Sequence, residues 1–260
     1  MPLVKSAQRV ADLLDLVSRH PPGLSYSEIL EASDFPKSSL HELLATLVHE
    51  QMLRYDPASK RYGLGSRLFA IASGYKDQFP IAPAAWPLMA AIRDELNETV
   101  QLAVLDGSMV VYLAKVESRR PLQLASSVGS RLPAYATGIG QALLAALPDE
   151  ALDLYCPPTF DAFTPATIRS REHLREKLRT TRQMGFATDL GEYSADTCCV
   201  AVPVLGTDHQ AAGALSISVS ASRFDTEHRD LLATVLREKA HTLSLQLGST
   251  DPDRWRHRGS

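Results

Sequence analysis

The segment 36–49, PKSSLHELLATLVH, combines an apolar stripe with a polar face that could contact duplex DNA. The stripe, at helical spacing, consists of Leu40, Leu43, Leu44, Leu47 and Val48. The opposite face carries the short or polar side chains of Ser38, Glu42, Ala45 and His49, flanked by Ser39 and Thr46. Pro36 suits the first helical position, and Lys37 beside the free amides of the first turn would attract a phosphate. The pattern is typical of a recognition helix.

A basic hairpin is predicted directly after this helix. Residues 52–55 and 61–64 favour short strands around a turn at 56–59. An isolated hairpin of this kind could equally be a solvated surface feature. Its position behind a helix-turn-helix pattern favours a wing that contacts phosphates. The predicted phosphate contacts are Arg54, Lys60 and Arg61 on the wing, with Lys5, Arg9 and Lys37 on the helices.

A second group of residues could bind a small molecule. The segment 129–147 passes from a loop into a helix that begins near Gly138, where the free amides of Ile139 and Gly140 would face a carboxylate. The alternative is that these glycines only allow close helix packing, and the spacing alone favours it. In the segment 212–220 three serines alternate with apolar residues, which indicates either a polar pocket wall or a solvent-facing strand.

Composition sets limits on the class of protein. A chain of 260 residues with 45% apolar and 22% charged residues suits two soluble domains. No apolar run approaches the ~18 residues of a membrane span, and Asp12 and Asp15 interrupt the N-terminal apolar stretch. We therefore expect a cytoplasmic protein. With a net charge of −3, any binding to DNA must depend on where the charges are placed.

The periodicities predict the elements that position these residues. Helices are expected over 7–17, 26–32, 36–49, 66–82, 88–96, 138–147, 170–184 and 226–247. Strands are expected over 99–105, 109–116, 122–126, 186–189, 199–204 and 212–220. This order predicts an α+β protein with a winged helix-turn-helix at 1–65, a linker helix at 66–82, a ligand domain at 83–248 and a disordered tail at 249–260.

In order and spacing, several stretches resemble the IclR family of bacterial transcription regulators. They are VKSAQRVADLLDLV, FPKSSLHELLATLV, DPASKRYGLGSRL, VGSRLPAYATGIGQALLAALPDE, FTPATI, GFATDLGEYS, CCVAVPV and GALSIS. The resemblance implies a GAF-like effector domain with an antiparallel sheet flanked by helices. It also implies homodimers or homotetramers that bind palindromic operator DNA and respond to small organic or aromatic acids, as repressor or activator.

The family's effector pocket maps onto particular positions of this chain. The resemblance implies a lining of Thr137, Gly138, Ile139, Gly140, Asp189, Cys199, Ser216 and Ser218. We add Leu122 and Tyr135, whose ring could stack on an aromatic ligand. The family usually has a histidine at Tyr135, a lysine at Gln141 and an arginine near Cys198. Without these basic groups we expect a ligand that is less acidic or bulkier than a small dicarboxylate.

The recognition helix also departs from the family. Glu42 stands where an arginine is usual, and Gln51 where the family has a turn glycine. A carboxylate facing the groove repels phosphate and can accept a hydrogen bond from the cytosine N4 amine, so Glu42 could select an unusual operator. The alternative is that Glu42 is solvated or pairs with a nearby basic residue.

Other classes of function have weaker support in the sequence. The chain lacks G-x-S-x-G, H-E-x-x-H, a P-loop and a dinucleotide fingerprint, and no histidine is spaced to activate Cys199 as a nucleophile. We therefore expect no enzyme, and no metal or other cofactor. Adjacent Cys198 and Cys199 leave a thiol-based redox sensor as an alternative, although cysteines in buried strands usually act as small apolar residues.

Overall fold

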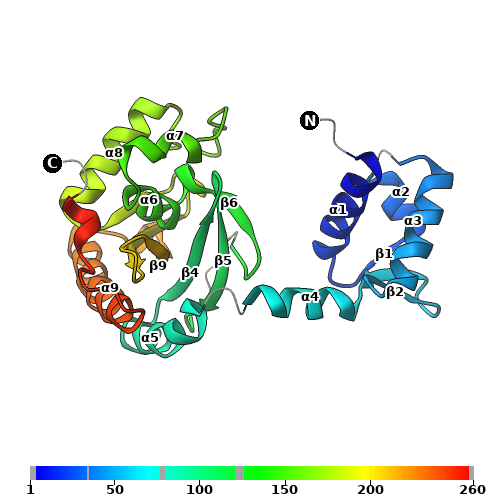
Figure 1. Ribbon diagram of the computed structural model, residues 1–260, viewed down its shortest axis with the longest axis horizontal. Coiled ribbons are helices and arrows are strands. Elements are labelled where there is room, and N and C mark those ends of the chain that lie inside the picture. The colour runs from blue at the N-terminus through cyan, green and yellow to red at the C-terminus, as the bar shows by residue number, and fades with distance from the viewer. Residues whose placement is uncertain (1–3, 34, 77–79, 121–123, 125, 258–260) are drawn as a thin grey trace. The chain divides into compact units, whose positions relative to one another are not determined.

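The computed structural model describes residues 4–33, 35–76, 80–120, 124 and 126–257 (Figure 1). The chain forms two compact units, residues 1–79 and 80–260. Each unit has its own sheet and its own buried residues. In the described residues no helix is both long and apolar enough to cross a membrane.

The N-terminal unit is a winged helix-turn-helix, as predicted. Its elements are α1 (Lys5–Ser18), β1 (Leu24–Ser25), α2 (Tyr26–Glu31), α3 (Lys37–His49), β2 (Leu53–Asp56), β3 (Arg61–Leu64) and α4 (Ser66–Lys76). The strands form an antiparallel sheet in the order β1-β3-β2. The core gathers one face of each of the first three helices, including Leu13, Ile29 and Leu44. The apolar stripe of α3 is therefore buried where its spacing placed it.

The start of each short helix follows from its capping residues. The Ser25 amide donates to Glu28 Oε2 at 2.7 Å, and the Glu28 amide donates to Ser25 Oγ at 3.3 Å, which completes the predicted capping box. Pro36 is the N-cap of α3, so the helix begins one residue later than predicted. Proline suits this site because the first amides of a helix have no partner within it.

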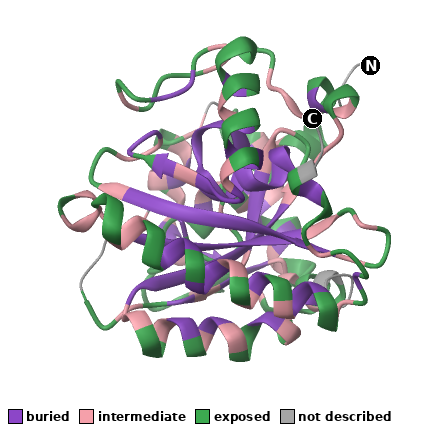
Figure 2. Cartoon of the chain, turned by 90° about the vertical axis from the view of Figure 1, so that its left-hand side faces the viewer, coloured by how far each residue is buried: buried purple, intermediate pink, exposed green. Residues whose placement is uncertain are grey.

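The C-terminal unit is a six-stranded antiparallel sheet between helices. Its strands are β4 (Thr99–Asp106), β5 (Met109–Val116), β6 (Arg131–Pro133), β7 (Ala187–Leu190), β8 (Thr197–Leu205) and β9 (Ala211–Ser220), in the order β6-β5-β4-β9-β8-β7. The helices are α5 (Ile81–Leu96), α6 (Gly138–Ala145), α7 (Leu152–Tyr155), α8 (Arg171–Met184) and α9 (Thr226–Gln246). Helices α5 and α9 cover one face and α6, backed by α8, covers the other, so the central strands are buried (Figure 2).

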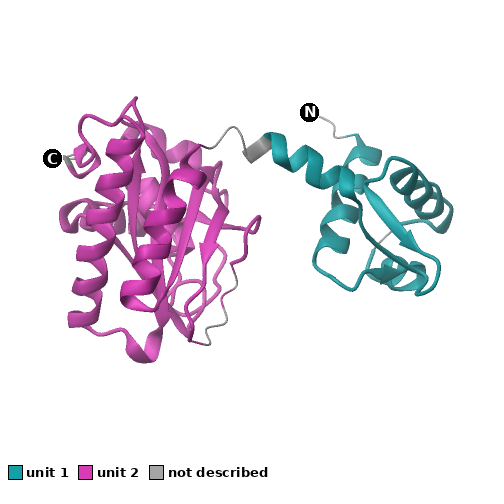
Figure 3. Cartoon of the chain, turned by 90° about the horizontal axis from the view of Figure 1, so that it is seen from below, with its two compact units in different colours: residues 1–79 teal, residues 80–260 magenta. Residues whose placement is uncertain are grey.

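The structure corrects the predicted linker. Helix α4 ends at Lys76 and α5 already begins at Ile81, so residues 66–82 are not one helix (Figure 3). Pro83 lies in the first turn of α5, where no amide is needed, so it does not interrupt the helix. The unit boundary falls after residue 79, and α4 belongs with the N-terminal unit.

The structure describes only part of the strand predicted at 122–126. Residues 122, 123 and 125 lie outside the described residues, and Leu124 and Ser126 are not in a strand. The segment beside β5 is β6, which follows a turn at Gly129, where φ is +86°. Leu132 of β6 is buried, and this burial favours the later segment as the edge strand.

The predicted disordered tail is ordered over its first part. Residues 254–257 form a 3-10 helix, and the Trp255 side chain is 1% exposed. The free energy gained by burying the large apolar area of this tryptophan exceeds the cost of ordering the polar residues around it. Residues 258–260 lie outside the described residues.

Candidate functional site: a DNA-binding face and a polar cavity

The polar face of α3 is exposed, as its sequence predicted. Lys37, Ser38 and Glu42 are exposed and Ser39 is half-buried, whereas Leu40, Leu44 and Leu47 on the opposite side are buried. The exposed face continues through Ala45, Thr46 and His49. Short side chains allow the backbone of such a helix to approach the floor of a major groove closely.

Glu42 lies in a shallow groove that α3 forms with α1. Ser6, Arg9 and Ser39 line the same groove. The Arg9 guanidinium lies 5.8 Å from the centre of the Phe35 ring. No ion pair joins Glu42 to a basic side chain in the part of the chain that the structure describes. The Glu42 carboxylate is therefore exposed to solvent and open to a partner, while pairing with a neighbour finds no support.

The wing residues divide into free and engaged side chains. Arg61 is engaged: its Nη1 donates to the Gly23 carbonyl at 2.7 Å and lies 3.1 Å from the Glu28 carboxylate. Lys60, at the turn with φ +55°, and Arg54, lying across Gly63, are exposed and make no ion pair among the described residues. Arg61 therefore serves the fold of the wing, and the predicted phosphate contact there competes with these bonds.

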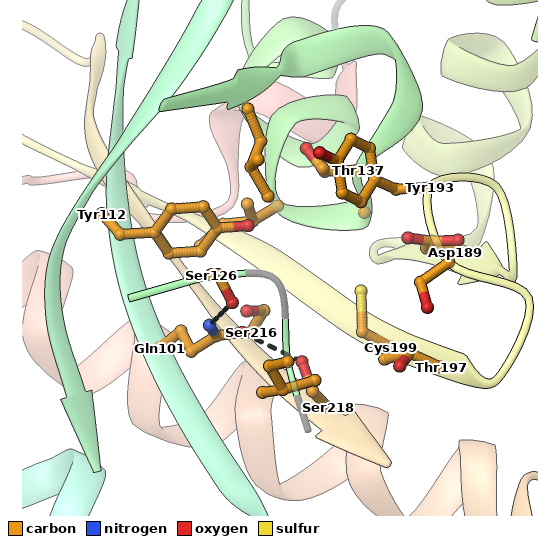
Figure 4. A pocket seen from close by; sticks show the side chains of 15 residues that line it. Gln101, Tyr112, Ser126, Thr137, Asp189, Tyr193, Thr197, Cys199, Ser216 and Ser218 are labelled. Carbon is orange, nitrogen blue, oxygen red and sulfur yellow. Dashed lines mark hydrogen bonds between the residues drawn. The ribbon is translucent and has the colours of Figure 1, made fainter. Parts of the chain in front are cut away.

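The second site is a cavity in the C-terminal unit between the sheet and the start of α6 (Figure 4). Strand alternation places Ser216 and Ser218 of β9 on its wall, with Gln101 of β4 opposite Ser216 in the register. Cys199 of β8 pairs with Ser218 on one side and with Asp189 of β7 on the other. The serine alternation thus marks a pocket wall, and Ser220 lies beyond it, bonded to Ser222.

Six of the cavity's polar side chains were not predicted from the sequence. They are Gln101, Tyr112, Ser126, Tyr193, Ser194 and Thr197. Gln101 Nε2 donates to Ser126 Oγ, and Ser218 Oγ donates to Gln101 Oε1 at 3.0 Å. A single glutamine or tyrosine within an otherwise apolar strand, as in TVQLAV and VVYLA, is the signal that could have identified Gln101 and Tyr112.

The start of α6 holds two close-packed glycines. A Cβ on Gly138 would lie 2.5 Å from Cys199 Sγ, and a Cβ on Gly140 would lie 2.3 Å from the Ala134 carbonyl oxygen. The Gly140 amide donates to Thr137 Oγ1 at 3.2 Å. It is therefore not free to bind a ligand, and the prediction for this amide is wrong. The packing alternative therefore describes Gly140, whereas Thr137, Gly138 and Ile139 do line the cavity.

Asp189 is the ionisable carboxyl of the cavity and is 7% exposed. Its Oδ1 accepts a hydrogen bond from the Glu192 amide at 2.7 Å. Burial, together with the nearby Glu192 carboxylate, raises the pKa of Asp189 to about 7. The Glu192 side chain is itself held by Lys177 Nζ at 2.8 Å and by Gln141.

Of the predicted effector residues that the structure describes, Tyr135, like Gly140, does not line the cavity. The Tyr135 hydroxyl donates to the Asp161 carbonyl at 2.8 Å, and its ring packs 4.9 Å from the Phe160 ring. The ring is thus engaged outside the cavity, and stacking on a ligand there would fall to Tyr112 and Tyr193 instead. Leu122 lies outside the described residues, but Leu124 lines the cavity.

The cysteines do not form a reactive pair. Successive residues of a strand point to opposite faces, so Cys199 faces the cavity while Cys198 points away. Burial raises the pKa of the Cys198 thiol and raises the pKa of the Cys199 thiol further. Both therefore remain neutral thiols near pH 7, which disfavours a redox sensor or a cysteine nucleophile.

Comparison with known proteins relates both sites to a single family. Residues 6–57 match the IclR helix-turn-helix domain, and residues 73–245 match the C-terminal domain of the bacterial transcriptional regulator IclR. The chain is 32% identical over 249 residues to the HTH-type transcriptional regulator XynR of Escherichia coli, covering 95% of this chain and 99% of that protein.

Solved structures that resemble this chain belong to the same family. IclR of Thermotoga maritima is 28% identical with a TM-score of 0.78, covering 94% of this chain and 99% of that one. An IclR homolog from Microbacterium hydrocarbonoxydans, crystallised with 4-hydroxybenzoate, shares the fold at 24% identity with a TM-score of 0.78, covering 93% of this chain and 98% of that one.

Proposed function

Because this chain belongs to the IclR family of bacterial transcriptional regulators, we propose that it binds palindromic operators as a homodimer or homotetramer and senses a small organic or aromatic acid. The observation that carries the proposal is a chain with both an exposed polar recognition face on α3 and a cavity lined by polar side chains. The first suits duplex DNA, and the second suits a small ligand.

On the DNA side, α3 enters the major groove with Ser38, Ser39 and Glu42 toward the bases. Lys37 at its start and Lys60 and Arg54 on the wing contact phosphates, which position the helix without reading sequence. Arg9 and Lys5 on α1 add charge near the same surface. A symmetric oligomer presents two such helices, and two-fold symmetry in the protein corresponds to a palindrome in the operator.

On the ligand side, an acid effector occupies the cavity between α6 and β9. The amide of Ile139 at the helix start and the Ser216 hydroxyl are suited to a carboxylate. The rings of Tyr112 and Tyr193 offer surface to an aromatic acid, and the relative crystallised with 4-hydroxybenzoate supports this class. Ligand binding changes the separation of the two DNA-binding units in the oligomer, and half-sites about one helical turn apart tolerate little such change.

A pair of binding measurements tests the proposal. The purified chain is titrated with the duplex from the promoter beside its own coding region, at several salt concentrations, with an unrelated duplex as control. A thermal-shift screen of carboxylic and aromatic acids follows, since a ligand that prefers the native state raises the melting temperature. We expect a salt-sensitive preference for the promoter that the best acid changes. No preference for any duplex would refute the DNA-binding part.

Ser216→Ala locates the ligand site. This variant loses one hydroxyl on the cavity wall and should reduce the thermal shift produced by the best acid. Ser222→Ala, which removes a hydroxyl outside the cavity, is the matched control. An undiminished shift in Ser216→Ala would place the effector elsewhere.

A further inference from the structure

Among the described residues that line it, the cavity contains an acidic side chain but no basic one. Of its described lining residues, Asp189 alone carries a carboxyl group, and none is a lysine, arginine or histidine. The remaining polar lining is made of hydroxyl, amide and thiol groups. A ligand carboxylate that enters this cavity therefore meets a second carboxyl group with no cation between them.

The groups around Asp189 do not supply that cation. Lys177 of α8 is the basic residue that acts on Asp189, but its ammonium is bonded to Glu192 Oε1 at 2.8 Å. The other titratable groups that act on Asp189 or face it are Glu192, Cys198, Cys199, Tyr112 and Tyr193. These are a further acid and weakly acidic thiols and phenols. The Glu192 amide donates to Oδ1 of Asp189, and the Gly191 amide also bonds to this carboxyl group, which lines the cavity where a ligand would meet it.

Two adjacent carboxylates in a buried site without a cation do not both stay ionised, and one of them keeps a proton. We propose that Asp189 binds the acid effector in its protonated form, donating its carboxyl hydrogen to the effector carboxylate, so that binding takes up a proton from solution. No covalent bond to the effector forms or breaks. The inference rests on the proposed function, in which the effector is an acid.

The remaining groups leave Asp189 to titrate in the neutral range. Its pKa is raised to about 7, whereas an ordinary carboxylic acid has a pKa of about 4 and stays ionised in the same range. Burial raises the pKa of the Cys199 thiol and of the Tyr112 hydroxyl, so both stay neutral. As the pH rises above about 7, the fraction of the protein with a protonated Asp189 falls. The effector acid can then bind only this smaller fraction.

The expected size follows from that fraction. Apparent affinity scales with the fraction of the protein in the competent state, so acid binding should weaken by about tenfold between about pH 6 and about pH 8. Above the pKa of Asp189 the loss of affinity approaches about tenfold per pH unit. Binding should take up about half a proton near pH 7 and nearly one near pH 8. An uncharged amide of the same acid has no carboxylate to repel and should show no such loss.

The experiment uses the full chain and named probes. Acetate, lactate, benzoate and 4-hydroxybenzoate, each beside its primary amide, are screened by thermal shift, and the best acid is then titrated calorimetrically near pH 6, 7 and 8. Repeating each titration in buffers of different ionisation enthalpy gives the number of protons taken up. Affinity that is constant or rises with pH, or the absence of proton uptake near pH 8, would overturn the proposal.

Asp189→Asn separates this role from a structural one. The asparagine Oδ1 can still accept the Glu192 amide, and its Nδ2 is a donor that does not titrate. The variant should bind the acid equally near pH 6 and pH 8, without proton uptake, and about tenfold more tightly than wild type near pH 8. Asp161→Asn, at an exposed aspartate of the same unit, should keep the wild-type pH profile.

The outcomes distinguish the two proposals. If no acid binds at any pH, acid sensing fails and the role of Asp189 fails with it. If an acid binds with the same pH profile in wild type and Asp189→Asn, acid sensing stands and the protonated role of Asp189 is refuted. Should the variant fail to fold, proton uptake by the wild-type chain still decides.

Discussion

The recognition face of α3 and the cavity beside α6 both gather polar side chains, but only the cavity buries them. On α3 the side chains of Ser38 and Glu42 are exposed to solvent. In the cavity Ser216 is 1% exposed and Ser218 is 4% exposed, and Ser218 bonds to Gln101. Exposed polar groups cost the fold nothing and remain available to a large partner. Buried groups are stable only when they bond one another, so a ligand must match or replace those bonds.

This contrast explains where selectivity can arise. On α3 the proposed base contacts come from Ser38, Ser39 and Glu42, of which Glu42 alone is charged. In the cavity, replacing a polar partner with a group that cannot bond leaves a buried donor or acceptor unsatisfied, at a cost of about 1–3 kcal/mol. The cavity is therefore expected to discriminate between close analogues, and α3 between operators through few positions.

The substitution with the largest expected effect on stability acts on the N-terminal unit alone. Leu44→Ala removes a buried side chain of the α3 stripe and should lower the free energy of unfolding of the N-terminal unit by about 2–5 kcal/mol. Operator binding should be lost, while the thermal shift from a cavity ligand persists in the C-terminal unit. Calorimetry with and without ligand measures both. Loss of the ligand response as well would show that the units do not act as separate folding bodies.

Glu42→Ala tests how α3 reads sequence. If the carboxylate accepts a hydrogen bond from a cytosine, the variant should lose about 1–3 kcal/mol of discrimination at one base pair of each half-site. Binding across an operator library measures this. Glu31→Ala makes the same charge change at an exposed site on α2 and should leave base preference unchanged. Equal preference in wild type and Glu42→Ala would reduce Glu42 to a solvated side chain.

Elements that are determined by residues close together in the chain can be predicted from the sequence. The capping box at Ser25 and the leucine stripe of α3 act within a few residues, so the helix-turn-helix follows directly from the chain. The edge strand β6 has three residues, and its place depends on a turn at Gly129 and on the burial of Leu132 against other elements. The order at Trp255 has the same origin, because its burial depends on the packed unit.

The residues that line the cavity are likewise hard to predict from local sequence patterns. Alternation in β9 predicted that Ser216 and Ser218 share a face, but which face lines a pocket depends on strand pairing. Gln101 and Tyr112 lie in apolar strands, and only the register brings them to that wall. Asp189 and Cys199 were placed by resemblance to the family, since single residues have no periodicity to reveal them.

Ser218→Ala sharpens the comparison within one strand. The variant leaves Gln101 Oε1 without its 3.0 Å bond and should weaken the best cavity ligand by about 1 kcal/mol, or about fivefold. Ser220→Ala, two residues further along the same face but bonded outside the cavity, should have no effect. Titration calorimetry compares the two variants. Equal effects would mean that the ligand does not contact this wall.

The smallest expected effect concerns the wing, where two adjacent basic residues differ in their contacts. Lys60 makes no ion pair among the described residues, so Lys60→Gln should remove one phosphate contact and little else. Its affinity should fall by less than about 1 kcal/mol, equally for operator and unrelated duplex, and the slope of log affinity against log salt should lose about 0.9.

Arg61→Gln should behave differently, because Arg61 holds the Gly23 carbonyl and the Glu28 carboxylate. Its loss should lower the melting temperature of the N-terminal unit, and the salt slope should change less than in Lys60→Gln. Anisotropy titrations at several salt concentrations, paired with thermal melts, separate the two. If Arg61→Gln left the melting temperature unchanged and lowered the salt slope as Lys60→Gln does, Arg61 would release its internal partners to bind phosphate. The wing would then rearrange on DNA.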